Sequence, residues 1–289
     1  MFSTNYSLNK TQTENVLEVS SDTGAYCKIN LSLGGSIQEL VLDNKTIIKQ
    51  SEKEYHQGFH SAILFPFPNR IFGGRYSFEG KEYQLPINFK SENNAIHGLV
   101  FDKEFKLVGK KLLKDKAVIS LRYIEKKPIE GFPYYYTLDV IYMLSSDKLL
   151  MELAIKNDDL KTFPFGFGWH PYFAAPDLVN TKLKMDAEYK YEDGKLESCE
   201  LPTEFEVKEQ EFDDCFKLND RDVLLKTSEY NLKISTSTKD MFVQLYIPES
   251  RDAIAIEPMT VAPDSFNNKF GLMELKSKKE FRITYKLEV

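Results

Sequence analysis

Alternation of apolar and polar residues at every second position is the feature that most constrains the fold of this chain. In residues 281–288, "FRITYKLE", every second side chain is apolar, and the residues between them are charged or polar. This repeat is typical of a β-strand with one buried face, because successive side chains of a strand point to opposite faces. Apolar residues at the spacing of a helix are scarce. The sequence therefore predicts a protein built mostly of strands.

Three further segments predict strand pairs and bends. Residues 134–144, "YYYTLDVIYML", and residues 149–156, "LLMELAIK", flank the turn sequence "SSDK" and are expected to form a long hairpin. The segment "RYSFEGKEYQL" repeats this pattern, with Glu79 and Gly80 at the turn. In "INLSLGGSIQELVL" a Gly-Gly pair interrupts the alternation, which indicates a bulge or a tight bend. Many strands without βαβ units favour an all-β fold, a large antiparallel β-sandwich.

The domain organisation follows from length and composition. The 289 residues would suit about two average domains, but all-β sandwiches of this size also occur as one domain. A hydrophobic fraction of 42% can fill one large core, and the chain has no linker-like segment rich in Pro, Gly or Ser. We therefore expect a single domain over residues 1–289.

Several classes of partner are disfavoured. The net charge is −6 and the arginines are few and scattered, so no nucleic-acid partner is expected. Cys27, Cys199 and Cys215 lack CxxC spacing, which argues against a disulfide framework or a zinc site. The first residues carry no apolar signal-like stretch, and no run of 18 apolar residues follows. We expect a cytoplasmic protein with reduced thiols and no membrane partner.

Two residues are placed as an acid/base pair would need them. Glu257 follows the apolar run "AIAI", and Pro258 is expected to hold it extended and to end the strand's ladder. Partial desolvation there would raise the pKa of the carboxyl group toward that of a usable general base. His170, in "GFGWHPYF", precedes Pro171 in the same way, and an imidazole pKa of about 6.5 suits proton exchange at neutral pH.

Other polar residues lie in apolar or small-residue segments and are weaker candidates. Asn69 and Arg70 lie in "FPFPNRIF", His97 in "NAIHGLVF", and Asp213 and Asp214 in "EFDDCF". Taken singly, each has a structural explanation: a salt-bridge partner for the arginine, a core position for the histidine and a turn for the two aspartates.

Nucleophile and metal motifs are missing. The sequence contains no GxSxG, HExxH or P-loop. His56 and His60 have the spacing of a metal pair on a helix, but Gly58 weakens a helix there and no third ligand is evident. We therefore expect neither a metal nor a cofactor.

Taken in order, the segments "NRI", "GGRYSFEGKEYQL", "IHG", "HPYF", "DDCF", "IEP" and "DSFN" resemble the aldose 1-epimerase (galactose mutarotase) family. The resemblance spans roughly residues 20–289. It implies a galactose mutarotase-like supersandwich with a sugar in an open cleft across one sheet, and an isomerase of carbohydrate metabolism. Such an enzyme interconverts the α and β anomers of a free aldose such as glucose or galactose by acid/base ring opening and closure. We expect a small-molecule sugar as its partner, and a monomer or a homodimer.

The resemblance also implies roles for individual residues. Glu257 would be the general base at the anomeric hydroxyl, and His170 the general acid at the ring oxygen. The residues expected to hold or surround the sugar are Asn69, Arg70, His97, Tyr172 and Asp213. Asp213 is preferred to Asp214 because the family's acid stands three residues before a phenylalanine, here Phe216.

This sequence departs from the best-known members beside the histidine. Trp169 and Pro171 stand where those members have an asparagine and a small or polar residue. Trp169 is expected in the core rather than against a sugar face, because strand neighbours point to opposite sides. Gly166 and Gly168 would leave room for a pyranose or mark a bulge.

Two alternative functions remain open. One is a hexose-6-phosphate 1-epimerase, which the few arginines disfavour, because guanidinium groups are suited to binding phosphate. The other is a non-catalytic sugar-binding protein on the same fold.

Overall fold

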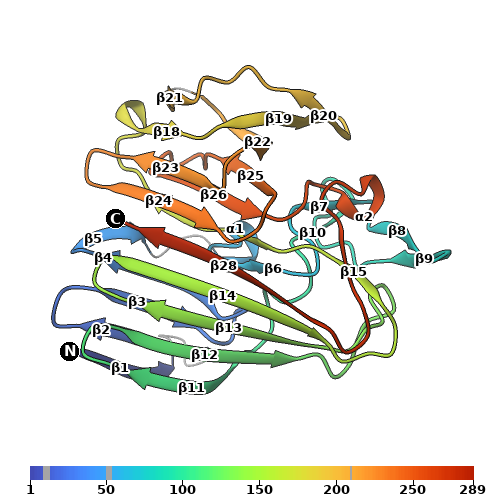
Figure 1. Ribbon diagram of the computed structural model, residues 1–289, viewed down its shortest axis with the longest axis horizontal. Helices are drawn as coiled ribbons and strands as arrows, with labels where there is room; N and C mark the ends of the chain where they lie inside the picture. Colours follow the sequence, from blue (N-terminus) through green and yellow to red (C-terminus); the bar gives the residue numbers. More distant parts are fainter. Residues whose placement is uncertain (9–13, 50–53, 209) are drawn as a thin grey trace.

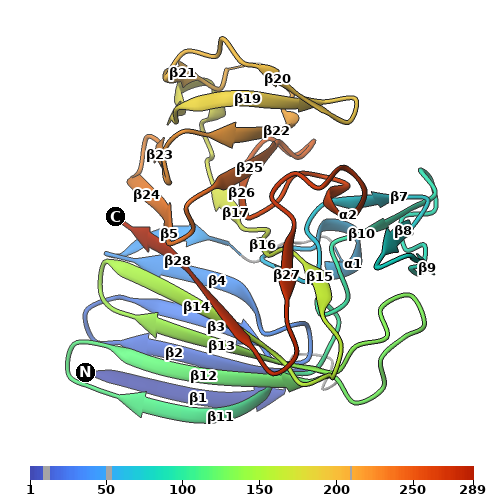
Figure 2. The same ribbon diagram turned by 45° about the vertical axis from the view of Figure 1, so that its right-hand side comes forward.

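The computed structural model describes residues 1–8, 14–49, 54–208 and 210–289. Their secondary structure is almost entirely strand, arranged in antiparallel sheets with short helices between some of them (Figure 1). Two broad layers of strands pack face to face, as Figures 1 and 2 show from two directions. The expected all-β antiparallel sandwich is confirmed.

One layer is a sheet of nine strands within the described residues, in the order β11-β12-β13-β14-β28-β24-β23-β18-β21. Its strands are β11 (Lys106–Leu112), β12 (Ala117–Ile124), β13 (Tyr136–Leu144), β14 (Lys148–Asn157), β18 (Lys182–Lys184), β21 (Glu204–Glu206), β23 (Asp222–Lys226), β24 (Asn231–Thr236) and β28 (Glu280–Glu288).

The facing layer is made of two sheets that continue one another, because β5 lies beside β17. The first sheet is β1 (Phe2–Leu8), β2 (Asn15–Ser21), β3 (Tyr26–Asn30), β4 (Ser36–Leu42) and β5 (Lys45–Ile48), in chain order. The second has the order β20-β19-β22-β25-β26-β16-β6, and β17 pairs with β26 as well. Its strands are β6 (Ile63–Leu64), β16 (Gly168–Trp169), β17 (Tyr172–Ala174), β19 (Ala187–Glu192), β20 (Lys195–Ser198), β22 (Asp213–Leu218), β25 (Met241–Tyr246) and β26 (Ala253–Met259).

Short elements surround one end of the second sheet. The two-stranded pairs are β7 (Arg70–Phe72) with β10 (Asn94–Ile96), β8 (Arg75–Phe78) with β9 (Lys81–Gln84), and β15 (Phe163–Phe165) with β27 (Met273–Leu275). The helices of the described residues are α1 (Tyr55–Gly58), α2 (Ser265–Asn268) and a single 3₁₀ turn, η1 (Leu178–Asn180).

The expected hairpins form with small shifts at their ends. β13 and β14 pair from Tyr136 with Asn157 to Leu144 with Leu149, and buried residues recur at alternate positions of β13. The turn between β8 and β9 uses Glu79 and Gly80, both with positive φ, which suits the twist of a tight hairpin. Gly34 and Gly35 also have positive φ, so the Gly-Gly pair makes a tight bend between β3 and β4.

The core lies between the two layers. The hydroxyl of Tyr142 on β13 donates to the carbonyl of Gly35 at 2.8 Å, which ties the layers together at this point. Trp169 is fully buried, with its ring 6.4 Å from that of Tyr285 on β28. Its predicted core position is therefore confirmed.

One expectation about β26 was wrong, because Pro258 does not end its ladder. The strand continues to Met259, and Pro258 lies opposite Val243 of β25. The amide of Thr260 donates to the carbonyl of Phe167, on the side where β16 and β17 pair with β26. Alternate residues of a strand direct their amides to the same side, so the missing N–H of Pro258 falls where this pairing is interrupted. The proline therefore removes no ladder hydrogen bond.

A close backbone contact fixes the segment that follows β10. Gly98 has φ +75°, and a Cβ added to it would lie 2.2 Å from the carbonyl oxygen of Phe65. The amide of Leu99 donates to that same oxygen at 2.7 Å. Only glycine fits this position without displacing the backbone.

We predict that Gly98→Ala lowers the free energy of unfolding by about 2–5 kcal/mol. The alanine would have to adopt a left-handed backbone conformation, and its Cβ would also clash with the carbonyl group of Phe65. Gly80→Ala is the matched control, because Gly80 also has positive φ but an added Cβ would meet nothing within 4 Å. It should cost about 1–2 kcal/mol, the conformational part alone. Urea denaturation measures both changes, and equal losses would contradict the importance of the contact with Phe65.

Candidate active site

Strand register places a set of polar side chains on one face of the second sheet. Asp213 of β22 lies opposite Tyr246 of β25, and Gln244 of β25 lies opposite Glu257 of β26. Directly opposed residues, and alternate residues of one strand, point to the same face of a sheet. Tyr172 of β17 borders β26 from its other side. Four strands therefore supply neighbouring groups to one surface.

The two histidines come from irregular segments beside this face. His170 lies in the short interruption between β16 and β17, where its amide donates to the carbonyl of Ala62 at 3.0 Å. Its own carbonyl accepts from the amide of Ser61 at 2.8 Å. His97 follows β10 with φ 61°, and its amide donates to the carbonyl of Asn69 at 2.8 Å. Backbone hydrogen bonds thus hold both imidazoles in place.

The seven residues to which the resemblance assigns a catalytic or sugar-binding role line one cavity of about 260 Å³. They are Asn69, Arg70, His97, His170, Tyr172, Asp213 and Glu257. Sequence reasoning missed Gln244, Tyr246 and Glu92, which line the same cavity. Gln244 left a usable signal, because it is the single polar residue in "MFVQLY", a strand that is otherwise apolar.

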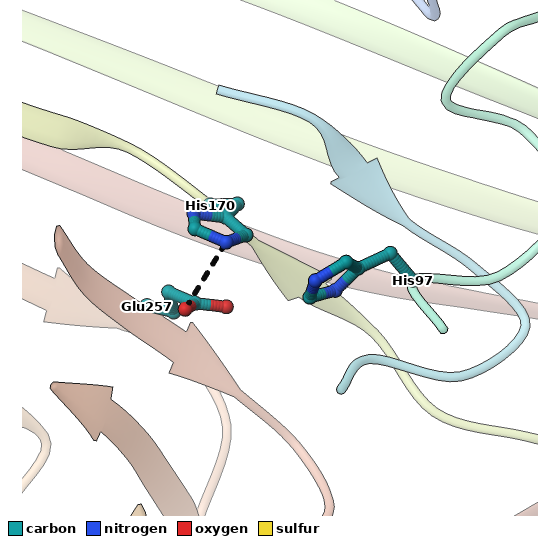
Figure 3. Close-up of side chains that lie close together, drawn as sticks. All are labelled: His97, His170 and Glu257. Carbon is teal, nitrogen blue, oxygen red and sulfur yellow. Dashed lines mark ion pairs between the residues drawn. The ribbon is translucent and has the colours of Figure 1, made fainter. Parts of the chain in front are cut away.

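The cavity is lined at one point by a contact between an imidazole and a carboxyl group. Nε2 of His170 lies 3.3 Å from Oε1 of Glu257, and Figure 3 shows the two side chains facing each other. The residues are 5% and 2% exposed. Oε2 of Glu257 and Nδ1 of His170 have no hydrogen-bond partner among the described residues. Each group therefore has one buried polar atom that the described part of the chain leaves unpaired.

Burial sets the charge of this pair. It raises the pKa of Glu257 well above its usual value near 4.5, and the negative charge of Asp213 acts in the same direction. Burial also lowers the pKa of His170 well below its usual value near 6.5, with smaller contributions from His97 and His60. The sequence-based expectation of an unperturbed His170 was therefore wrong. At neutral pH the pair is favoured as a neutral unit that holds one proton on the carboxyl group.

Neutral aromatic groups flank the pair. Burial, with help from the charge of Arg70, lowers the pKa of His97 to about 3, so its ring is uncharged at neutral pH. The rings of His97 and His170 lie edge to face, with centroids 5.0 Å apart. Tyr172 stacks on His170, also with centroids 5.0 Å apart, at an interplanar angle of 12°. The imidazole of His170 is thus fixed by packing as well as by its backbone.

A chain of hydrogen bonds runs along the cavity wall. Arg70 donates from Nη1 to Glu92 at 2.8 Å and from Nε to Oδ1 of Asn69 at 3.1 Å. The amide group of Asn69 donates to Oε1 of Gln244 at 3.1 Å. Gln244 in turn donates from Nε2 to Oδ1 of Asp213 at 2.8 Å. Each side chain is oriented by its neighbours, which preorganises the wall for a polar ligand.

The structure separates the two candidate aspartates. Asp213 lines the cavity, and burial raises the pKa of its carboxyl group. Oδ1 of Asp214 lies 2.8 Å from Nζ of Lys190, on the other face of β22. The geometry therefore favours Asp213 as the acid that faces a ligand.

Gly166 and Gly168 do not make room for a ligand, so that alternative was wrong. A Cβ on Gly166 would lie 2.5 Å from the side chain of Val261, and one on Gly168 would lie 2.7 Å from that of Pro68. Neither glycine lines the cavity. Their missing side chains permit close packing beneath the site.

The other histidines and the cysteines can also be located in the structure. Helix α1 is one turn that ends at Gly58, so it does not place His56 and His60 on a common helical face. The ring of His60 instead lies 4.4 Å from that of Tyr172. All three cysteines are free thiols. Among the described residues, no helix has the length and apolar character needed to cross a membrane.

A family model described as aldose 1-epimerase matches residues 16–288. The chain belongs to the aldose 1-epimerase family.

Individual relatives agree with this membership. YihR of Escherichia coli, itself uncharacterised, is 27% identical over 288 residues, which cover 93% of this chain and 92% of YihR. Galactose mutarotase of Rattus norvegicus is 29% identical over 139 residues, 46% of this chain and 38% of that protein. The crystal structure of a galactose mutarotase-like protein from Clostridium acetobutylicum superposes with a TM-score of 0.87 at 21% identity, covering 99% and 98% of the two chains. That structure supports the shared fold.

We predict that Glu257→Gln gains stability relative to the wild type as pH rises from about 5 to 8. The pKa of Glu257 is higher in the folded than in the unfolded protein. The stability linked to this proton is therefore fully present below about pH 4.5 and is lost as the pH rises toward the folded pKa. Glutamine imitates the protonated form and lacks this loss. The difference should grow by at most about 1.4 kcal/mol per pH unit. Urea denaturation at several pH values measures it, and a constant difference would contradict the raised pKa.

Proposed function

We propose that this protein is an aldose 1-epimerase that interconverts the α and β anomers of a free aldose such as glucose or galactose. The observation that carries the proposal is the meeting of His170 and Glu257 at 3.3 Å on the wall of a polar cavity. Family membership and the partial match to galactose mutarotases support the same reaction.

Ring opening requires one proton to leave an oxygen and another to arrive. In the proposed reaction the carboxylate of Glu257 takes the proton of the C1 hydroxyl. The C1=O bond forms, the C1–O5 bond breaks, and its electron pair goes to the ring oxygen, which takes a proton from His170. The open aldehyde then rotates about C1–C2, and the reverse transfers close the ring on the other face. Proton transfers of this kind contribute about 10²–10⁴-fold each.

The neutral pair suits this cycle. Ring opening begins with His170 protonated and Glu257 ionised, and it ends with His170 neutral and Glu257 protonated. Burial favours this final arrangement in the empty site. The open aldehyde therefore faces an uncharged pair. When a sugar binds, its hydroxyls hydrogen-bond to the carboxylate and the imidazolium and stabilise these charged forms. They therefore favour transfer of the proton from Glu257 to His170, which prepares the pair for ring opening.

The cavity wall supplies the groups that would hold the sugar. The cavity has a volume of about 260 Å³, just below the range of about 300–1,000 Å³ typical of pockets for drug-sized ligands. This size suits one sugar ring. Arg70, Asn69 and Asp213 offer fixed donors and acceptors along one side. His97, which is uncharged, can hydrogen-bond near the ring oxygen beside His170.

The charges of the cavity favour a free sugar over a sugar phosphate. Among the described lining residues, Arg70 is the sole side chain with a permanent positive charge, and Glu92 already pairs with it at 2.8 Å. Asp213 adds a further carboxyl group to the same wall. A phosphate dianion would meet this acidic surface without an unpaired guanidinium to balance it.

Polarimetry on freshly dissolved α-glucose, α-galactose and α-glucose 6-phosphate tests the proposal. We expect faster mutarotation of the free sugars. Acceleration with the 6-phosphate alone would instead identify a hexose-6-phosphate 1-epimerase. Calorimetric binding of a sugar without acceleration would identify a non-catalytic sugar-binding protein.

We predict that His170→Asn and Glu257→Gln each lower kcat by about 10²–10⁴-fold, because each removes one proton-transfer group. Circular dichroism and thermal melting should show that both variants remain folded. Wild-type rates in either variant would overturn the assigned roles.

Asp213→Asn should lower kcat/KM for the sugar by about 10-fold or more, since it weakens a hydrogen bond made by a charged acceptor worth about 1.5–3 kcal/mol. Asp214→Asn is the matched control, because Asp214 pairs with Lys190 away from the cavity. It should leave kcat/KM unchanged. Equal effects of the two substitutions would contradict the choice of Asp213.

A further inference from the structure

The two proposed catalytic groups and His97 form a cluster that has the chemistry of a metal site. One ligand atom of each of His97, His170 and Glu257 can be chosen so that all three lie within 4.8 Å of one another. Figure 3 shows the three side chains close together, with Glu257 below His170 and His97 to its right. Two imidazoles and one carboxylate are a common zinc ligand set.

The separations in the cluster approach those of a tetrahedral ion. With Zn–N and Zn–O bonds of about 2.0–2.2 Å, two ligand atoms on a tetrahedral edge lie about 3.3–3.5 Å apart. Nε2 of His170 and Oε1 of Glu257 already lie 3.3 Å apart. The remaining separations are at most 4.8 Å, so the three groups can close on an ion through shifts of about 1–1.5 Å.

Buried polar atoms of all three residues lack hydrogen-bond partners within the part of the chain that the structure describes. Oε2 of Glu257, Nδ1 of His170 and Nδ1 of His97 lack hydrogen-bond partners among the described residues. Glu257 and His170 are more than nine-tenths buried, and both line the cavity. An ion that replaces the contact between Nε2 of His170 and Oε1 of Glu257 could also take Nδ1 of His97 as a ligand atom.

We propose that the cluster of His97, His170 and Glu257 binds a zinc ion that blocks the active site. The ion occupies the lone pairs that the reaction needs for proton transfer, and it takes the place of the sugar's C1–O5 region. Zinc and an aldose are therefore mutually exclusive. The inhibition rests on the proposed function, whereas the binding of zinc does not.

Selectivity follows from the ligand types. Imidazole nitrogens bind zinc and copper well, whereas magnesium and calcium prefer sites made wholly of oxygen atoms. Magnesium and calcium are expected to leave turnover unchanged at concentrations at which zinc inhibits. Cobalt(II) can stand in for zinc and reports tetrahedral coordination by its visible absorption.

The test uses the full chain, stripped with a chelator, in a Cys199→Ser background that removes the partly exposed thiol. Calorimetry with zinc chloride should give one ion per chain, and saturating glucose should weaken the apparent affinity. His97→Gln should weaken zinc binding at least about 10-fold, because even residues that only support ligands contribute about 10–100-fold. His56→Gln is the matched control, since His56 is an exposed histidine outside the cluster, and it should bind zinc normally.

The outcomes separate the two proposals. The metal site would be overturned if neither His97→Gln nor Glu257→Gln weakened zinc binding. It would also be overturned if the chain bound glucose and saturating glucose did not weaken zinc binding. The second variant covers the case in which the first fails to fold. Zinc binding at the cluster in a chain that accelerates no sugar would leave the metal site standing and reject the epimerase. Sugar turnover that zinc does not inhibit would reject the metal site and leave the epimerase proposal standing.

Discussion

The pairing register of four strands is the constraint on which the candidate site depends. Asp213, Gln244 and Glu257 share a face of the second sheet because their strands pair as they do, and Tyr172 borders that face on the next strand. A slip of one residue in β26 would turn Glu257 into the core and bring Ile256 to the cavity. Apolar residues on the core face oppose such a slip, so the packing that stabilises the fold also determines which groups meet a ligand.

Burial then determines the protonation state of His170 and Glu257. A carboxyl group and an imidazole at the surface would both be charged near pH 6 and would attract each other weakly through water. In the cavity the loss of water disfavours both charges, and the pair holds its single proton in the uncharged form. Isolated polar groups at this depth cost stability. The fold tolerates them because β25 pairs with β26 without interruption, from Phe242 opposite Met259 to Tyr246 opposite Ala255.

The sequence predicted much of this because strong local signals coincide with the site. Two-residue alternation predicted the strands, and a proline after His170 and another after Glu257 marked these residues as conformationally restrained. Other features depend on the three-dimensional arrangement. Gln244 acquires its importance from the strand opposite it, and the lowered pKa of His170 comes from surroundings that no local pattern specifies. Pro258 was misjudged because the sequence does not reveal that the neighbouring strand is interrupted there.

The cavity is built from two kinds of segment, and this division bears on how the family could diversify. The pair of His170 and Glu257 is anchored by paired strands and by backbone hydrogen bonds, whereas part of the rim comes from short elements and connections that carry Gln57, Phe89 and Glu92. Under the proposed function, exchanges in those segments can alter which pattern of sugar hydroxyls is accepted while the sheet beneath keeps its geometry. A sugar preference of this kind could then change in evolution without a change in the sheet or in the placement of His170 and Glu257.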